Sequence, residues 1–169
     1  MKRFTLFLLG LFLCLGNTKA QSLIGTWKSI TESKGQEIEV FFTFAESTFN
    51  MRNVFSINEP SLGIITFSIS IPGDYTLLDD KLTIKSKANK VEFKIENMEF
   101  VGEVAEKIRQ KPELKEQIKT MLEKRIKKTK KKFLSGFPND GEIPIISHTD
   151  TQLILSLGRG ESMTFTRVQ

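Results

Sequence analysis

The residues that could carry catalysis are few and scattered along the chain. His148 is the single histidine and Cys14 the single cysteine. A Ser-His-Asp or Cys-His nucleophile would have to be built on His148, yet no Gly-x-Ser-x-Gly elbow accompanies it. We therefore interpret His148 as an ordinary strand or loop residue, and we expect a protein without catalytic residues that is not an enzyme.

Metal and phosphate sites have no better support. Zinc needs clustered Cys and His ligands, which are missing. Four acidic residues lie near expected turns, namely Glu59, Asp74, Asp79 and Asp80. Their spacing differs from that of a calcium-binding loop, so turn formation is the preferred interpretation. Gly158-Arg159-Gly160 lacks the strand-to-helix context of a phosphate loop and predicts a hairpin turn. Neither a metal nor a cofactor is expected.

The first 20 residues have the organisation of a cleavable secretory signal. Lys2 and Arg3 precede an apolar run from Phe4 to Gly16, and Thr18-Lys19-Ala20 supplies small residues for cleavage after Ala20. The run is shorter than the roughly 20 residues of a membrane-spanning helix. A lipid anchor on Cys14 is the alternative, disfavoured by the bulky Leu13 before it. We expect residues 21–169 to form one exported domain in the periplasm, the cell envelope or the medium.

Most of the chain after the leader alternates apolar and polar residues with period two, which is typical of half-buried strands. The alternating apolar positions include Ile38, Val40, Phe42, Phe44, Phe49, Met51, Ile65, Phe67, Ile69, Ile71, Leu82, Ile84, Val91, Phe93 and Ile95. Turn-forming residues separate the segments, for example at Ala45-Glu46, Asn58-Glu59-Pro60, Pro72-Gly73-Asp74 and Asp79-Asp80. About eight to ten strands result, which predicts an antiparallel β-barrel, with a two-sheet sandwich as the alternative.

Residues 101–134 change to helical spacing and interrupt the strands before the last three. Because Pro112 suits the first turn of a helix, we expect two helices, 101–110 and 112–134. The second carries an apolar stripe of Leu114, Ile118, Met121, Leu122, Ile126 and Phe133. This insertion holds 12 Lys and Arg against 5 Glu.

The basic residues gather near the end of the second helix, at Lys124, Lys127, Lys128, Lys130 and Lys131. They are either a solvated face favoured by the helix dipole or a patch for an anionic surface. Interleaved aromatic residues for base stacking are absent, so nucleic acid is the least favoured of the anionic partners.

The two ends of the chain resemble the lipocalin and wider calycin superfamily. Gly25-Thr26-Trp27 is similar to the G-x-W motif that opens the first strand there, and Arg167 matches the basic residue of the last strand that packs across the tryptophan. Gly73-Asp74-Tyr75-Thr76-Leu77 resembles the middle hairpin of exported lipocalin-like domains of Bacteroidetes-type bacteria. The resemblance implies a closed barrel and a habit of binding small molecules. The helical insertion departs from the family, whose helix follows the barrel.

The expected interior is rich in phenylalanine, of which the chain has 14. The candidate cavity residues share the inward parity of their strands: Phe42, Phe44, Phe49, Met51, Phe67, Phe93 and Ile95. An eight-stranded barrel is either filled by its own side chains or holds one small ligand.

Two functions follow. The first is a non-enzymatic binding protein that holds a small hydrophobic ligand in the barrel, with the helical insertion as a lid. The alternative is an envelope interaction protein with a solid barrel, whose basic helix docks on an anionic surface or partner protein. In neither case is it an integral membrane protein.

Overall fold

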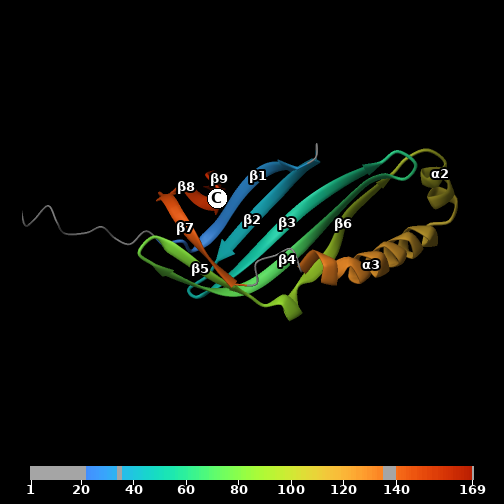
Figure 1. Ribbon diagram of the computed structural model, residues 1–169. Coiled ribbons are helices and arrows are strands. Elements are labelled where there is room, and N and C mark those ends of the chain that lie inside the picture. The colour runs from blue at the N-terminus through green and yellow to red at the C-terminus, as the bar shows by residue number, and fades with distance from the viewer. Residues whose placement is uncertain (1–21, 34–35, 135–139, 169) are drawn as a thin grey trace, which may run out of the picture.

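The computed structural model describes residues 22–33, 36–134 and 140–168 (Figure 1). The expected leader, residues 1–20, lies outside the described residues. The elements are β1 Gly25–Ser33, β2 Gln36–Phe44, β3 Thr48–Glu59, β4 Gly63–Leu78, β5 Lys81–Ser86, a short 3-10 helix η1 Ala88–Lys90, β6 Glu92–Phe100, α2 Gly102–Gln110, α3 Glu113–Leu134, β7 Asp140–His148, β8 Gln152–Gly158 and β9 Glu161–Arg167.

Eight of the strands form a closed antiparallel ring. Their order is β3-β2-β1-β9-β8-β7-β5-β4, and β4 pairs in turn with β3. Each strand therefore has a hydrogen-bonded neighbour on both sides, which closes a barrel and leaves no second sheet to form a sandwich. The prediction of a mainly β antiparallel barrel with a helical insertion before the last three strands is confirmed.

The ninth strand, β6, lies outside this ring. The second half of β4 pairs with β5, whereas its first half, Gly63–Ser70, pairs with β6. The short helix η1 connects β5 to β6, and the two strands pair with successive parts of β4 on the same side. Strands β1, β2, β3, β4 and β6 thus continue past the ring as a sheet with two edges, which we call the open sheet (Figure 1).

Pro72-Gly73 does not break a strand, and the prediction of a turn there was wrong. β4 runs through both residues, and Pro72 lies at the step between β6 and β5. Proline lacks an N–H, but neither β5 nor β6 pairs with β4 at Pro72, so no strand is there to accept one. The Pro72 carbonyl still accepts a hydrogen bond from the N–H of Lys87, at 2.8 Å.

The Asp79-Asp80 turn joins β4 and β5 as expected. Both residues have positive φ angles, 48° and 57°. Two successive left-handed residues make the type of two-residue turn that matches the twist of a hairpin, and Asp tolerates this conformation better than most residues.

The two helices begin one residue later than the sequence predicted. Helix α3 packs against β6, with Leu114, Ile118, Leu122 and Ile126 half-buried. Met121 is 53% exposed, so its prediction as part of the buried stripe was wrong, and the side chain of Phe133 lies outside the described residues.

Helix α3 covers the inner face of the open sheet along β6. The side chains of Ile95 and Met98 are buried, whereas Glu92, Lys94 and Glu99 on the same strand are exposed. Because a helix buries the strand face on which it packs, α3 must lie on the side of Ile95 and Met98.

Two apolar clusters form the core. The larger fills the ring and consists of Leu23, Trp27, Val40, Phe42, Phe44, Phe49, Leu82, Ile84, Leu153, Leu155 and Phe165. The smaller lies on the inner face of the open sheet and consists of Ile69, Ile71 and Val91, with Met51, Phe55, Phe67 and Phe93 packed against it. Met51 contacts both clusters, so the two interiors are continuous.

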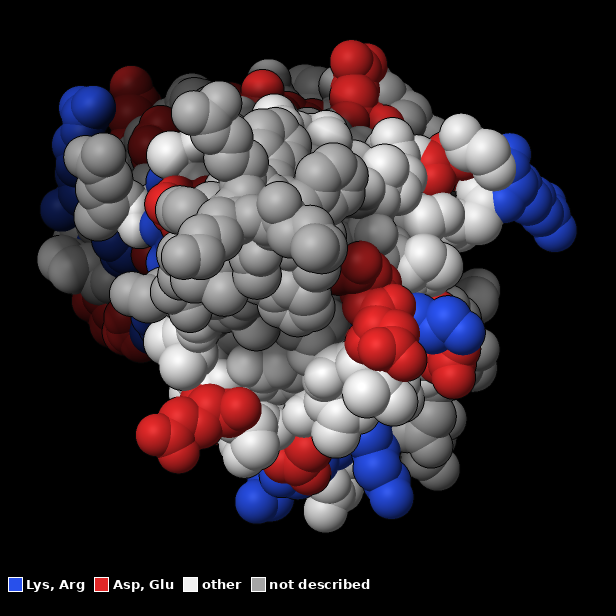
Figure 2. All heavy atoms as spheres, turned by 90° about the vertical axis from the view of Figure 1, so that its left-hand side faces the viewer, with Lys and Arg blue, Asp and Glu red and all other residues white. Residues whose placement is uncertain are grey.

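The end of the molecule that carries β7, β8 and β9 has a surface of mixed charge. Figure 2 shows acidic and basic side chains around its rim, without a broad patch of one sign among the described residues. Neither helix of the described chain is long and apolar enough to cross a membrane.

Candidate functional site

Trp27 and Arg167 lie together where the chain ends meet. The Trp27 ring is fully buried, and its Nε1 donates to the Leu23 carbonyl at 2.8 Å. The guanidinium carbon of Arg167 lies 4.4 Å from the ring centroid. Three nitrogens of the same guanidinium donate to the carbonyls of Asp150, Ile24 and Ser22, at 2.7, 2.8 and 3.2 Å. Arg167 therefore ties the last strand to the segment before β1.

The absence of a side chain at Gly25 leaves space for the Arg167 guanidinium. A Cβ at Gly25 would lie 2.8 Å from Nη1 of Arg167, and the φ angle of the residue, +131°, favours glycine. The contact between Trp27 and Arg167 therefore requires glycine at position 25, so the two ends of the chain depend on each other for this packing.

His148 packs edge-on against the same tryptophan. The ring centroids of His148 and Trp27 are 5.4 Å apart at an interplanar angle of 67°. Burial lowers the pKa of His148 below its ordinary 6.5, and the positive charge of Arg167 lowers it further. Its Nε2 is buried and has no hydrogen-bond partner among the described residues. The imidazole is therefore neutral at pH 7 and serves as packing for Trp27.

Three of the seven candidate cavity residues fill the ring with one another. The ring centroids of Phe42 and Phe44 are 5.5 Å apart, those of Phe42 and Phe49 are 6.0 Å apart, and Phe165 of β9 lies 5.5 Å from Phe42. All four side chains are buried. Gly73 allows this packing, because a Cβ there would collide with the Phe49 ring. These rings are core.

The other candidate cavity residues, Met51, Phe67, Phe93 and Ile95, lie further along, toward or within the open sheet. Ile38, Phe55, Phe67 and Ile95 are directly paired across β2, β3, β4 and β6. We call these four residues the inner row. Phe55 and Phe67 are stacked, with ring centroids 5.2 Å apart. Ile95 is buried, but the other three are only half-buried although they face inward.

Phe55 and Ile38 were missing from the predicted cavity. Phe55 shares the parity of Phe49 and Met51, so the alternation of β3 contains the signal that would have found it. Asn53 interrupts the apolar series at the position between them, which made the strand look shorter in the sequence.

Two buried polar residues lie one row closer to the ring. Ser29 and Asn53 both pair with Val40, from the two sides of β2, and both are buried. They share the inner face with the inner row, because residues two apart in a strand point to the same side. An amide offers two donors and an acceptor, and a hydroxyl offers one donor. The inner face therefore combines half-open apolar side chains with uncharged polar groups.

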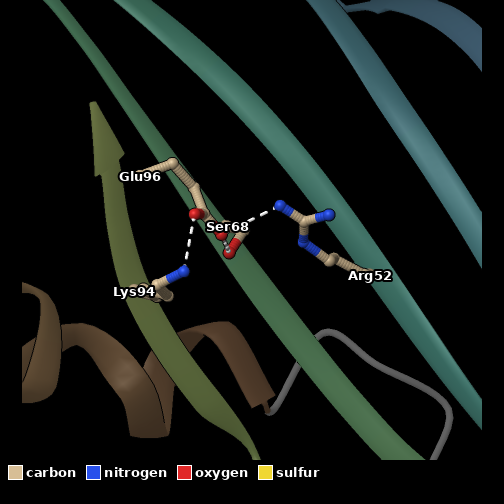
Figure 3. Close-up of polar contacts among 4 residues, drawn as sticks. All are labelled: Arg52, Ser68, Lys94 and Glu96. Carbon is tan, nitrogen blue, oxygen red and sulfur yellow. Dashed lines mark hydrogen bonds and ion pairs between the residues drawn. The ribbon is translucent and has the colours of Figure 1, made fainter.

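The outer face of the open sheet carries a saturated carboxylate (Figure 3). Oε1 of Glu96 accepts from Ser68 at 2.7 Å and from Arg52 at 2.9 Å, while Oε2 accepts from Lys94 at 2.8 Å. The hydrogen bonds from Lys94 and Ser68, followed by that from Arg52, lower the pKa of Glu96 from 4.5 to about 2. A carboxylate held ionised in this way is suited to joining three strands rather than to exchanging protons near neutral pH.

The predicted basic patch lies on the second half of α3. The side chains of Lys124 and Lys128 are exposed, as is Arg125 between them. Lys127, Lys130 and Lys131 belong to the same helix, and their side chains lie outside the described residues. Within the described ranges no group of three or more His, Cys, Asp and Glu residues is placed to hold a metal ion.

No protein-family model matches the sequence, and no curated protein matches it. Two solved structures are similar over most of the chain. One is an uncharacterized protein from Bacteroides eggerthii, 15% identical, covering 87% of this chain and 100% of its own, with a TM-score of 0.42. The other is a lipocalin-like protein from Bacteroides uniformis, 15% identical, covering 86% and 98%, with a TM-score of 0.39. Similarity at this level assigns neither a family nor a ligand.

Proposed function

We propose that the protein is an exported, non-enzymatic binding protein that holds a small molecule with an apolar body on the inner row. The observation that carries the proposal is that Ile38, Phe55 and Phe67 face inward and are nevertheless half-exposed. Removing apolar surface from water contributes about 25 cal/mol per Å². Three such side chains in one row therefore favour an apolar occupant.

The polar groups of the inner face indicate which apolar molecules fit. Ligand sites are mostly apolar, with a few polar groups that fix orientation. Ser29 and Asn53 supply uncharged hydrogen-bonding groups beside the inner row. An amphiphile with an uncharged polar head, such as an alcohol, ester or amide, fits this combination better than a bare hydrocarbon.

Helix α3 fits the role of a cover for such a molecule. It packs on β6, at one end of the inner row, through side chains that are half-buried. A helix held by partly buried contacts moves more readily than a strand of the ring, because local opening costs least where few apolar contacts are buried.

A fluorescent polyene long-chain alcohol, titrated into the purified protein, tests this proposal. Phe55→Ser and Phe67→Ser should each weaken binding at least tenfold, because each change removes an aromatic side chain of the inner row. Phe41→Ser is the matched control, since Phe41 points to the outer face of the neighbouring strand. Equal affinities for all three variants and the unaltered protein would contradict the proposal.

The basic helix supports a second candidate function, docking on an anionic lipid surface. Met121 is 53% exposed on the helix that carries Lys124 and Lys128. An apolar side chain among cations is typical of helices that lie at a membrane surface. Sedimentation with vesicles of anionic lipid tests it: Lys124→Glu with Lys128→Glu should abolish binding, and vesicles of zwitterionic lipid should not bind. Binding that survives the charge reversal would reject this candidate.

A further inference from the structure

The edge of β1 beyond Lys28 lacks a strand partner among the described residues. β9 pairs with β1 through Trp27 and Lys28 and then diverges, so Ile30 and Glu32 have no neighbour on that side. The N–H of Val168 donates to the Thr26 carbonyl, which shows that even-numbered residues of β1 direct their backbone groups away from β2. The N–H and C=O of Ile30 and Glu32 therefore point outward, ready to pair.

Within the described part of the chain, this edge has no proline, bulge or covering element. Proteins guard exposed edges with these features and with charged side chains, of which β1 has Lys28 and Glu32. The pairing of β1 with β2 is regular from Gly25 to Ser33, and β1 contains no proline. At the opposite edge of the open sheet, by contrast, the pairing of β6 with β4 is irregular, and α3 packs against β6. The difference points to β1 as an edge that is used.

We propose that two copies of the protein associate by antiparallel pairing of their β1 edges around Thr31. In this register Ile30 of one copy faces the partner's Glu32, and the reverse pair repeats it by symmetry. Residues that face each other with outward backbone groups exchange two hydrogen bonds, so the two pairs form four. Lys28, which β9 already pairs, is left outside the ladder.

Charges on the outer face suit this register. Glu32 lies directly opposite Glu37 in the pairing of β1 with β2, and like charges in that position repel. Lys28 lies two residues from Ile30 on the same face and is therefore diagonal to the partner's Glu32, while its ammonium is ion-paired with Glu39 of β2 in its own copy. The second copy therefore brings this cation near the acidic pair of Glu32 and Glu37.

Apolar surface is available at the same place. Ile30 is 56% exposed, although it lies in the middle of a strand. Ile30, Thr31, Glu32 and Glu37 line a hollow of about 420 Å³ beside it. Pairing of the edges would cover the two isoleucines, while the short contact would leave the association reversible and dependent on concentration.

Sedimentation velocity of the purified protein over a range of concentrations tests the proposal. We expect a monomer–dimer equilibrium, and Ile30→Pro should shift it toward monomer at least tenfold. Proline removes the outward N–H of residue 30 and leaves the bonds from β1 to β2 in place. Ile146→Lys is the control, because Ile146 is a 59% exposed isoleucine of another strand, β7. This variant should leave the equilibrium unchanged.

A second variant separates association from folding. Glu32→Lys should weaken the dimer at least tenfold, because the new cation lies diagonal to the partner's Lys28. It should also raise the thermal midpoint of the monomer, because the repulsion between Glu32 and Glu37 disappears. A protein that stays monomeric at the highest concentration reached, or a dimer that Ile30→Pro leaves intact, would overturn the proposal.

Discussion

The guanidinium carbon of Arg167 lies 4.4 Å from the centroid of the Trp27 ring, and the two residues face each other in the pairing of β9 with β1. The described pairing of these strands comprises this pair and Lys28 with Thr166. A barrel closed by so short a ladder needs side-chain contacts across the junction. The guanidinium supplies them, both to the indole and to the backbone carbonyls before β1.

Replacing Arg167 by alanine should therefore destabilise the barrel. A desolvated cation over an indole contributes up to about 2 kcal/mol, and each lost hydrogen bond about 1 kcal/mol. We expect unfolding in urea to lose about 2–4 kcal/mol and the emission of the single tryptophan to shift to the red. Arg109→Ala, at an exposed helix position, is the control. An unchanged midpoint with unchanged emission would show that the contact does not hold the junction.

The single histidine should make stability depend on pH near neutrality. The folded protein holds the pKa of His148 below the ordinary 6.5, chiefly by burial. Below pH 6.5 the unfolded chain binds a proton that the folded chain does not yet accept, so stability falls as the pH drops from 7 toward 5. One such group contributes at most about 1.4 kcal/mol per pH unit.

Thermal unfolding at pH 7.5, 6.5 and 5.5 measures this effect. In His148→Phe the loss of stability between pH 7.5 and 5.5 should be smaller, because the replacement ring cannot be protonated. The same slope in both proteins would assign the dependence to other groups.

Glu96 should stabilise the open sheet against acid. Its pKa is lowered to about 2, so its contribution is present above pH 4.5 and is lost as the pH falls from 4.5 toward 2. Glu96→Gln should lower the free energy of unfolding at pH 7 by about 1 kcal/mol, since solvent screens charges near the surface. It should also flatten the acid limb of the profile. Glu92→Gln, at an exposed position of the same strand, should do neither.

Helix α3 should depend on its half-buried side and not on Met121. Ile118→Asp places a charge at a half-buried position and should cost about 1–2 kcal/mol, less than the full burial of an isoleucine. Hydrogen exchange at the amides of α3 and β6 should accelerate. Met121→Asp changes an exposed side chain of the same helix and should have little effect. Similar acceleration in both variants would mean that the helix does not pack in this orientation.

The predicted leader is tested by the mass of the native protein. Protein recovered from the envelope fraction or the medium should begin at Gln21, because the small residues before it suit cleavage. A chain that still begins at Met1, or one with lipid on Cys14, would contradict the prediction.

The sequence pattern predicts the strands and helices of this fold better than it predicts how the strands pair. Period-two alternation indicated the strands, and helical spacing after Val101 indicated both helices, because each pattern depends on near neighbours in the chain. The sequence does not reveal that β4 pairs first with β6 and then with β5 on the same side. Either partner leaves the same alternation of apolar and polar residues in β4. Pro72 concealed this further by resembling a turn.

The candidate site was predictable in part for the same reason. Inward parity identified Phe42, Phe44, Phe49 and Phe67 alike, but parity does not say which of them lie within the ring. The ring packs the first three against Phe165, from the other end of the chain, and leaves Phe67 beside Phe55 in the open sheet. That division depends on strand order, which the sequence pattern does not contain.

The length of β4 gives the molecule two cooperative units that share one strand. Gly73 and Asp74 are paired with both β3 and β5, whereas Ile64 and Thr66 are paired with β3 and β6. Separation of β6 would release the first half of β4 while the second half stays bonded to β5. Amide exchange along this strand should therefore change rate near Pro72. The open sheet can therefore loosen at a free-energy cost below that of unfolding the barrel.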